Sequence, residues 1–222
     1  DTFYEAKFQN GDSVDMGAGD DIVYMAIDTA SVSMSKLDGG AGTDTLYFGP
    51  YMQSDESSTV ANNSTLSLTT AGATNFENLS GTSSNEILQG DANANTIYGQ
   101  DGTDNIFGYG GNDILYGYNQ RVTADNNTSL TYFSGDDILY GGAGNDVLYG
   151  TAGDNTLDGG TGKDTMYGGN GADTFVLRAG DGSSTLTSAD VIADFQNGTD
   201  VIGMDDGLLF TDLSVAQGTG GN

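Results

Sequence analysis

A period of nine residues runs through this chain and restricts its fold more than any other feature of the sequence. From residue 81 to residue 176, nine units share one register, with an interruption inside the unit that ends at Tyr140. Residues 141–149, for example, read GGAGNDVLY. Two further clear units span 16–24 and 39–47, and a weaker one surrounds Val14. Self-similarity at a fixed period is the signature of a repeat architecture.

Each unit divides into a glycine-rich turn and a very short strand. Positions one to six are rich in Gly because the turn needs backbone angles that side chains resist. Side chains alternate along a strand, so we expect position eight to point inward and positions seven and nine to point outward. The expected inward residues are Leu88, Ile97, Ile106, Leu115, Leu139, Leu148, Leu157, Met166 and Phe175.

The consensus G-G-x-G-x-D-x-U-x, where U is a large apolar residue, resembles the calcium-binding repeat of the RTX (repeats-in-toxin) family. The resemblance covers about two thirds of the chain, and a tandem run of nine units makes it specific. It implies an all-β fold, a right-handed parallel β-roll (a β-solenoid) with a C-terminal capping segment. One coil would use two nonapeptides, so that units n and n+2 lie side by side in one sheet.

Stacked coils would place the position-six carboxylates of units n and n+2 close together, where they repel unless a cation lies between them. Calcium suits such a site, because it accepts six to eight oxygens, from carboxylates and backbone carbonyls, in loose geometry. We therefore expect several Ca²⁺ ions. The expected ligands are Asp104, Asp137, Asn155 and Asp173 on one turn edge, Asp113, Asp146 and Asp164 on the other, with Asp21, Asp44 and Asp190 and the turn glycines Gly108, Gly110, Gly141, Gly144, Gly159 and Gly162.

The expected sites differ in strength. Counting along the repeat pairs Asp113 with Asp146, Asp146 with Asp164, and Asp104 with Asp137 in the best sites. Sites that use Asn155 lack one charge and should be weaker, and Glu86 and Asn95 depart from the motif at the start of the array. Asp12 upstream, and Asp194 and Asp200 downstream, are further candidates.

The composition excludes several classes of function. The formal net charge is −27, with 32 acidic and 5 basic residues, which opposes binding to nucleic acid or to an anionic membrane surface. The sequence has no His and no Cys, so the usual general base, zinc ligands and disulfides are missing, and we expect no enzyme activity. No apolar run approaches membrane-spanning length. Charge repulsion and 36 glycines favour an expanded chain when counter-ions are absent.

We expect four regions along the chain. Residues 1–50 form a degenerate N-terminal β-roll segment, and 51–80 a loop or linker. The main roll occupies 81–176, with an insertion at about 119–134 that contains Arg121 and has the composition of a pendant loop. Residues 177–222 form a C-terminal cap that is cut short. A solenoid needs such a cap over its last coil, and the apolar candidates are Val191, Ile192, Phe195, Val201, Ile202, Leu208, Leu209 and Phe210.

The resemblance implies an extracellular or bacterial cell-surface protein, exported by a type I-like system. The favoured hypothesis is calcium binding coupled to folding in a structural protein of the surface-layer, adhesin or matrix type. One alternative is the non-catalytic region of a secreted enzyme. Another is a carbohydrate-binding module that uses an aromatic ladder, for which a ladder that only stabilises the sheet is the simpler interpretation. Besides calcium, the expected partners are further copies of the chain in a surface array, or cell-surface polysaccharide. The ladder residues are Tyr98, Tyr116, Tyr149 and Tyr167.

Overall fold

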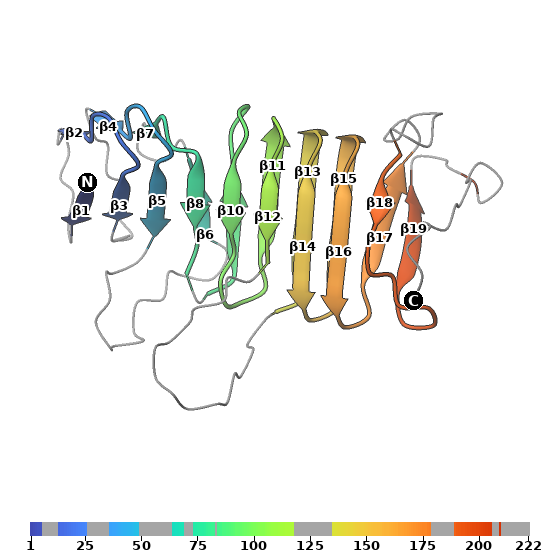
Figure 1. Cartoon of the computed structure of the whole chain (residues 1–222). Helices are drawn as coiled ribbons and strands as arrows, with labels where there is room; N and C mark the ends of the chain where they lie inside the picture. Colours follow the sequence, from blue (N-terminus) through green and yellow to red (C-terminus); the bar gives the residue numbers. More distant parts are fainter. Residues whose placement is uncertain are drawn as a thin grey trace.

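Short parallel strands stack along a roll of successive coils, in which each coil of the main roll contributes one strand to each of two sheets (Figure 1). The computed structural model describes residues 1–5, 13–25, 36–48, 64–68, 73–82, 84–117, 135–178, 189–205 and Leu209. Every pairing between strands in this part of the chain is parallel. No helix among the described residues is long and apolar enough to cross a membrane.

Two main sheets form opposite sides of the roll. The nine-stranded sheet contains, in spatial order, β1 (Thr2–Glu5), β3 (Ile22–Met25), β5 (Thr45–Phe48), β8 (Asn78–Ser80), β10 (Thr96–Tyr98), β12 (Ile114–Tyr116), β14 (Val147–Ala152), β16 (Thr165–Asn170) and β18 (Val191–Ile192). The seven-stranded sheet contains β6 (Ser64–Ser67), β9 (Glu86–Gln89), β11 (Asn105–Gly110), β13 (Ile138–Gly144), β15 (Thr156–Gly162), β17 (Thr174–Arg178) and β19 (Val201–Asp205). Consecutive units of the main roll alternate between the two sheets, which confirms the predicted parallel β-roll.

The core of the main roll is a single row of position-eight residues from each sheet. Leu115 pairs with Ile97 on one side and Leu148 on the other, and the next pair joins Leu148 to Met166. All nine predicted inward residues are fully buried. Each strand pairs with the strand two units away, because a coil consumes two units before the chain returns to the same sheet. This confirms the predicted stacking of units n and n+2.

The N-terminal coils contain a third strand; β2 falls on the weaker unit around Val14, but the repeat does not predict β4 or β7. β2 (Ser13–Asp15), β4 (Lys36–Asp38) and β7 (Ala73–Thr74) form a separate three-stranded sheet. Leu37 of β4 and Ala73 of β7 are buried and join the same apolar core. Register partners Ile22 and Thr45 are 23 positions apart, whereas Val147 and Thr165 of the main roll are 18 apart. The N-terminal coils are therefore longer and have three sides.

The prediction of a loop or linker over residues 51–80 is wrong for the second half of this range, because β6, β7 and β8 lie there and each joins a sheet. Leu66, Leu68 and Leu79 of this range are buried in the core, which explains why the chain follows the roll here. Residues 51–63 lie outside the described residues, as do Asp12, the insertion at 119–134 with Arg121, and the cap residues Leu208 and Phe210.

The C-terminal segment continues both sheets before it ends the roll. β18 pairs with β16, and β19 pairs with β17. Ile202 pairs with Phe175, and Ile192 packs against the core. Several predicted cap residues stay largely exposed, because they occupy outward positions of these last strands or follow them: Val191, Phe195, Val201 and Leu209.

Candidate functional site: two acidic turn edges

The turns that precede each strand have a backbone conformation that L side chains rarely adopt. Position four is in the left-handed region at Gly144 (φ 149°), and position two at Gly142 (φ 109°). Gln100, Tyr109 and Thr151 replace glycine at position two and still adopt a positive φ of 75–84°, whereas Thr82 and Asp91 at the same position do not. The tertiary structure therefore imposes this conformation even on residues for which it is unfavourable.

Position-six side chains link each coil to the next through hydrogen bonds to the backbone. The backbone nitrogen of Asp113 donates to Asp146 Oδ1 at 2.7 Å, and that of Asp146 donates to Asp164 Oδ1 at 2.8 Å. On the other edge, the backbone nitrogen of Asp104 donates to Asp137 Oδ1 at 2.8 Å. All three pairs expected from the repeat count are therefore brought together.

The second carboxylate oxygen of these residues is buried and has no hydrogen-bond donor. This holds for the Oδ2 atoms of Asp21, Asp44, Asp104, Asp113, Asp137, Asp146, Asp164 and Asp173. Each of these side chains is at most 1 % exposed. A buried carboxylate oxygen without a donor or a cation is costly. Eight such atoms at equivalent positions indicate that the turn edges are built for a positively charged ligand.

At five turns a backbone carbonyl oxygen and the unpartnered carboxylate oxygen both lie within 2.9 Å of a Cβ atom built on the position-one glycine; these are the turns of Asp44, Asp104, Asp113, Asp137 and Asp146. A Cβ atom added to Gly141 would lie 2.5 Å from both Asp146 Oδ2 and Gly159 O. At Gly108 the corresponding distances are 2.4 Å to Asp113 Oδ2 and 2.6 Å to Gly141 O. We call this arrangement of a position-one glycine, a carboxylate oxygen and a carbonyl oxygen a cradle. A side chain at position one of these cradles would collide with both oxygens, so glycine is required there, whereas the unit of Asp21 has Met16 at position one.

The other glycines that the sequence indicated fall into two groups. Gly144 and Gly162 are stacked against the carbonyl oxygens of Gly111 and Gly144, too closely for any side chain. Gly110 differs, because a Cβ atom there would first meet Ala92 at 3.6 Å. Space therefore does not require glycine at position 110.

Burial makes the carboxylates of the turn edges hard to ionise without a cation. Desolvation raises the pKa of Asp104 to about 8 and that of Asp137 to about 7, against the opposing effect of a backbone hydrogen bond. The pKa values of Asp113 and Asp146 rise to about 6 for the same reason. At neutral pH a cation would therefore both satisfy these oxygens and favour their ionised form.

The cradle atoms that could bind a cation are carboxylate and carbonyl oxygens, which are the ligands that a hard cation prefers. Among the described residues, no three His, Cys, Asp or Glu side chains gather at one point. Carboxylates would thus contribute singly or in pairs, with backbone carbonyls supplying further ligands. Calcium accepts such mixed, flexible oxygen sets, whereas magnesium demands stricter geometry. The donor set of the cradles therefore fits calcium.

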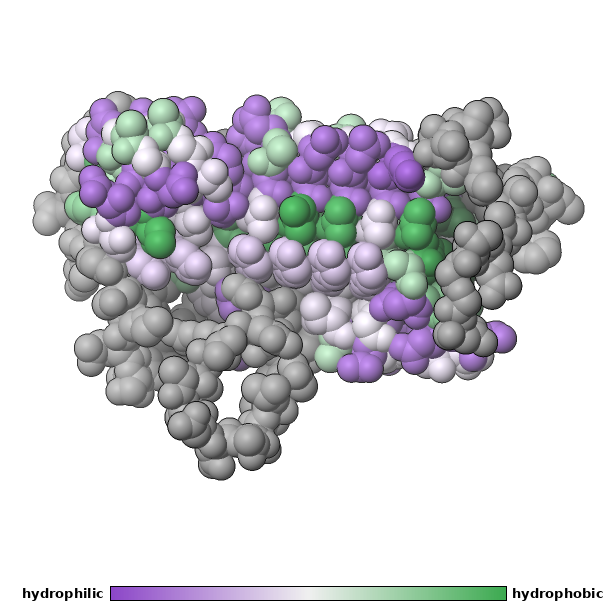
Figure 2. All heavy atoms as spheres, viewed as in Figure 1, coloured by the Kyte–Doolittle hydropathy of each residue, from purple (hydrophilic) through white to green (hydrophobic). Residues whose placement is uncertain are grey.

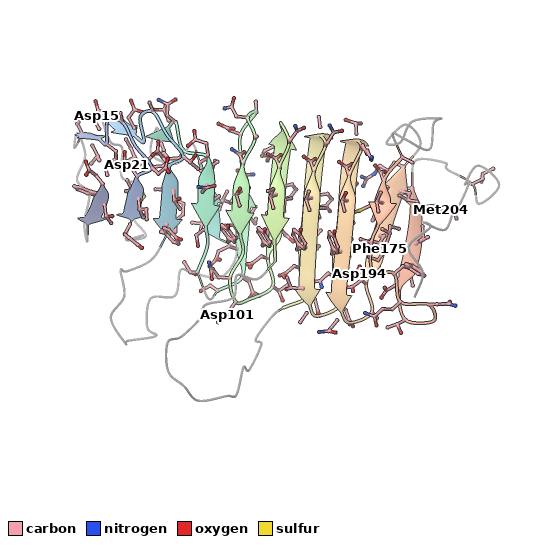
Figure 3. The ribbon with its side chains drawn as sticks, in the orientation of Figure 1. Asp15, Asp21, Asp101, Phe175, Asp194 and Met204 are labelled. Carbon is pink, nitrogen blue, oxygen red and sulfur yellow. The ribbon has the colours of Figure 1, made fainter. Side chains whose placement is uncertain are left out.

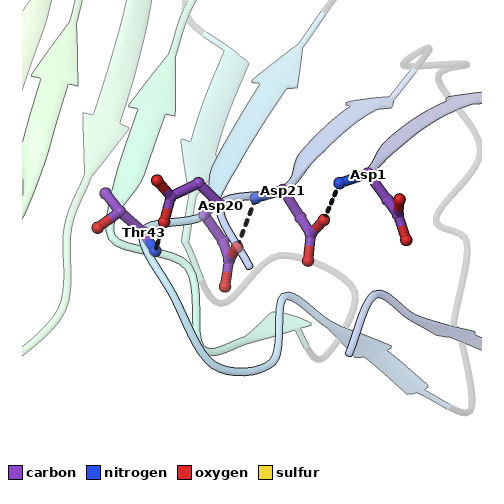
Figure 4. Close-up of polar contacts among 5 residues, drawn as sticks. Asp1, Asp20, Asp21 and Thr43 are labelled. Carbon is purple, nitrogen blue, oxygen red and sulfur yellow. Dashed lines mark hydrogen bonds and ion pairs between the residues drawn. The ribbon is translucent and has the colours of Figure 1, made fainter. Parts of the chain in front are cut away.

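The N-terminal coils repeat the same arrangement (Figure 4). The backbone nitrogen of Asp21 donates to Asp44 Oδ1 at 2.8 Å, and Asp21 Oδ1 accepts a hydrogen bond from the nitrogen of Asp1. The backbone nitrogen of Asp44 donates to Glu77 Oε2 at 2.8 Å. Asp21 and Asp44 are thus direct neighbours on the edge that continues to Asp164, although a longer segment separates them in the sequence.

Three acidic residues of the C-terminal segment complete the two ladders. Asp190 Oδ1 accepts from the backbone nitrogen of Asp164 at 2.9 Å, and Asp200 Oδ1 accepts from that of Asp173 at 3.1 Å. Asp194 accepts from the backbone nitrogens of Gly168 and Gly169, both at 2.9 Å. Figure 3 shows Asp21 and Asp194 near opposite ends of the roll. Asp190 and Asp200 therefore occupy the place of position six in the last coils.

A second, exposed ladder uses position five, which the sequence analysis treated as unconstrained. The backbone nitrogen of Asn145 donates to Asn112 Oδ1 at 2.8 Å, and that of Lys163 donates to Asn145 Oδ1 at 2.9 Å. Asp136 and Asp154 form the same links on the other edge. The frequent Asp and Asn at position five was a usable signal, because their short side chains bind nearby backbone groups.

A buried ion pair near the C-terminal end also escaped the sequence analysis. Asp158 replaces the aromatic residue at position nine and is only 2 % exposed. Its Oδ2 atom pairs with Nη1 of Arg178, whose Nε lies 3.5 Å from Asp205 Oδ2. The pairing ties β15 to β17 and β19. The lone Asp at position nine was its only sign in the sequence.

The tyrosines at position nine form stacked ladders on the outer face of the nine-stranded sheet. Ring centroids are 5.0 Å apart for Tyr98 and Tyr116, 4.9 Å for Tyr116 and Tyr149, and 4.8 Å for Tyr149 and Tyr167, with interplanar angles of 5–10°. Figure 2 shows the two outward positions of this sheet as parallel bands, with a hydrophilic band along the turns. The rings are half-buried, and the stacked rings cover one another's faces. A sugar ring would therefore meet mainly ring edges and hydroxyl groups.

Parallel strands, buried acidic turns and unpartnered oxygens define this molecule as a cation-binding β-roll. Residues 36–50, 80–117, 133–166 and 149–186 match, in four copies, the family model of the RTX calcium-binding nonapeptide repeat. The chain belongs to the RTX calcium-binding family, and its repeats are calcium-binding repeats. A search of curated proteins found no match.

Proposed function

We propose that this chain is the calcium-dependent folding module of a secreted structural protein, of the surface-layer, adhesin or matrix type. The observation that carries the calcium part is the set of eight buried Oδ2 atoms without donors. Without a cation, these atoms and the net charge of −27 oppose the folded roll. With calcium they become ligands that join one coil to the next. The candidate ligands are the position-six residues, with carbonyls such as those of Gly141 and Gly159 beside them.

This dependence supports export in an unfolded state through a type I-like system. Inside a cell calcium is scarce, and the roll lacks the ions that its cradles require. Extracellular calcium modules bind with dissociation constants of roughly 10⁻⁴ to 10⁻³ M. Outside the cell, calcium above that range would stabilise the folded state by mass action, because it binds the folded chain and not the unfolded chain.

A structural role is favoured over a catalytic one for this chain. The carboxylates that could act as acids or bases recur at equal intervals along two turn edges, each engaged with the backbone of the adjacent coil. The absence of His and Cys removes the usual nucleophile and base combinations. The stacked tyrosines support the role of a ladder that stabilises the sheet, because the stacked rings cover one another's faces.

Circular dichroism of the purified chain in calcium and in EDTA tests the proposal. We expect a β-rich spectrum in millimolar calcium and loss of that spectrum on chelation, with recovery when calcium is restored. Magnesium at equal concentration is the control, and it should restore much less structure. A spectrum that is equally β-rich in EDTA would contradict the proposed function. For the structural role, calcium-dependent assembly followed by light scattering is the corresponding measurement.

A further inference from the structure

Within the main roll (residues 81–176), three position-six residues lack the unpartnered oxygen that marks the other cradles. Glu86, Asn95 and Asn155 are as deeply buried as the aspartates but carry no side-chain atom without a partner. Glu86 Oε2 accepts from the backbone nitrogen of Thr82 at 3.1 Å, and Asn95 Oδ1 accepts from that of Asp91 at 2.8 Å. In these cradles a group of the chain itself contacts the oxygen that elsewhere lacks a donor.

Asn155 differs from the other two, because it places a donor where the aspartates place an acceptor. A Cβ atom added to Gly150 would lie 2.8 Å from Asn155 Nδ2 and 2.7 Å from Gly168 O, the counterpart of Gly159 O in the Asp146 cradle. Nδ2 donates to Gly153 O at 3.0 Å and to Asp173 Oδ1 at 3.1 Å, and it lies 3.4 Å from Gly168 O. Three oxygens therefore surround the amide nitrogen.

The surroundings fix the orientation of this amide. Asn155 Oδ1 accepts from the backbone nitrogen of Asp137 at 3.0 Å. Exchanging the amide oxygen and nitrogen would direct the NH₂ group at that N–H donor and the oxygen at three acceptors. Since an amide has two donors on nitrogen and only acceptors on oxygen, the exchanged orientation would lose every one of these hydrogen bonds.

We propose that the amide of Asn155 replaces a calcium ion, so that the main roll contains one coil junction held by hydrogen bonds instead of by an ion. The inference rests on the proposed calcium binding of the other cradles. Its basis is that Nδ2 occupies the position of the unpartnered Oδ2 and contacts carbonyl and carboxylate oxygens, as a cation would. The edge along the seven-stranded sheet is consequently interrupted between Asp137 and Asp173, whereas the other edge is continuous from Asp113 to Asp164.

Asn155→Asp should convert this junction into an ion site. Native mass spectrometry of the folded chain in excess calcium should show one more bound Ca²⁺ in Asn155→Asp than in the natural sequence. Asn145→Asp is the matched control: it adds the same charge one turn edge away, at an exposed position-five side chain whose Oδ1 contact with Lys163 the aspartate would retain. It should leave the ion count unchanged.

Asn155→Ala keeps the test decisive if the extra charge affects folding. It removes the donor without adding a ligand, so it should lower the melting temperature in excess calcium, and Asn155→Asp should melt above it. An unchanged ion count in Asn155→Asp, or failure of that variant to fold in excess calcium, overturns the inference while calcium binding by the natural chain stands. A natural chain that binds no calcium overturns the proposed function, and the inference with it.

Discussion

The N-terminal coils and the main roll contain the same kind of turn and share one sheet and one core, but they differ in the number of sides of a coil and in its length. Asp21 and Asp44 lie on their turn edge as Asp146 and Asp164 do, each with a buried Oδ2 atom that lacks a donor. However, the N-terminal coils add the strands of a third sheet, and the spacing of register partners there varies: Thr2 and Ile22 are 20 positions apart, and Ile22 and Thr45 are 23 apart, against 18 for Val147 and Thr165 in the main roll.

This difference shows that the nonapeptide defines a turn and the strand after it, but not the length of a coil. The remaining part of each coil is free to vary as long as it returns to the same sheet in register. In the N-terminal coils it does so through β2, β4 and β7, whose Leu37 and Ala73 extend the apolar core. The calcium concentration needed for folding should therefore depend on the turn residues, and the free energy of unfolding in saturating calcium should depend on the core residues.

The largest expected effect is the loss of a core side chain, and it compares the two regions directly. Leu148→Ala in the main roll and Leu46→Ala in the N-terminal coils each remove a fully buried leucine. Both should lower the free energy of unfolding by about 2–5 kcal/mol. Denaturant unfolding in saturating calcium measures this. If Leu46→Ala costs much less than Leu148→Ala, the N-terminal coils do not unfold together with the main roll.

Removing one turn carboxylate should have a smaller effect of similar size in both regions. Asp146→Asn and Asp44→Asn keep the hydrogen bond that Oδ1 accepts but remove a charge from a cradle. We expect the calcium concentration at the folding midpoint to rise about tenfold, corresponding to about 1.4 kcal/mol. Asp154→Asn removes the same charge from the exposed position-five ladder and should shift the midpoint little. Equal shifts in all three variants would show that net charge alone matters.

The ion-free chain should depend on pH in the direction opposite to the calcium-bound chain. The pKa values of Asp104 and Asp137 rise from 3.8 to about 8 and about 7 on folding, and that of Asp44 also rises. Between about pH 4 and pH 8 the folded state thus holds protons that the unfolded state has released, so its stability falls as pH increases. Circular dichroism in EDTA should show more β-structure at pH 5 than at pH 8.

In calcium the sign reverses, because protons compete with the ion for the same carboxylates. The calcium midpoint should therefore rise when the pH falls from 7 to 5. An ion-free β-signal that increases with pH would contradict the assigned burial of these carboxylates. Hydrogen exchange measured separately for the two regions would show whether the stability of the N-terminal coils depends on pH in the same direction as that of the main roll.

The smallest expected effect concerns the aromatic ladder. Tyr149 stacks on Tyr116 and Tyr167, whereas Tyr47 stacks on Tyr24, with centroids 5.0 Å apart, and has Ser80 as its register partner on the other side. Each stacked pair contributes about 0.5–1.5 kcal/mol beyond burial. Tyr149→Leu should therefore lower the melting temperature more than Tyr47→Leu. Tyr149→Phe keeps the stacked ring and should change the melting temperature little. A decrease in melting temperature equal to that of Tyr149→Leu would assign the effect to the hydroxyl group.

The sequence predicted the parts of the fold that the repeat encodes directly. The alternation of units between two sheets, the buried position-eight residues and the pairing of Asp113, Asp146 and Asp164 all follow from a fixed period. The repeat did not predict the position of Leu79, because its unit has Glu77 at position six and only one glycine. The structure places Leu79 in β8, in register with β5 and β10.

The rest depends on tertiary contacts that no period encodes. The pairing of Asp158 with Arg178 joins residues 20 positions apart. The partners of Glu86 and Asn155 were equally hidden, because their side chains are satisfied by groups that only the folded turn brings near them. Substitution away from the consensus therefore signalled a change of site, but not what replaced the ion.

The same register holds whether two stacked units are 18 or 33 positions apart. Asp146 accepts from Asp113 across 33 positions just as Asp164 accepts from Asp146 across 18. The additional residues between Asp113 and Asp146 thus add chain length without changing the register of the coils on either side. A molecule built in this way can gain, lose or exchange a segment at one turn as an independent evolutionary event, while the rest of the roll keeps its alignment.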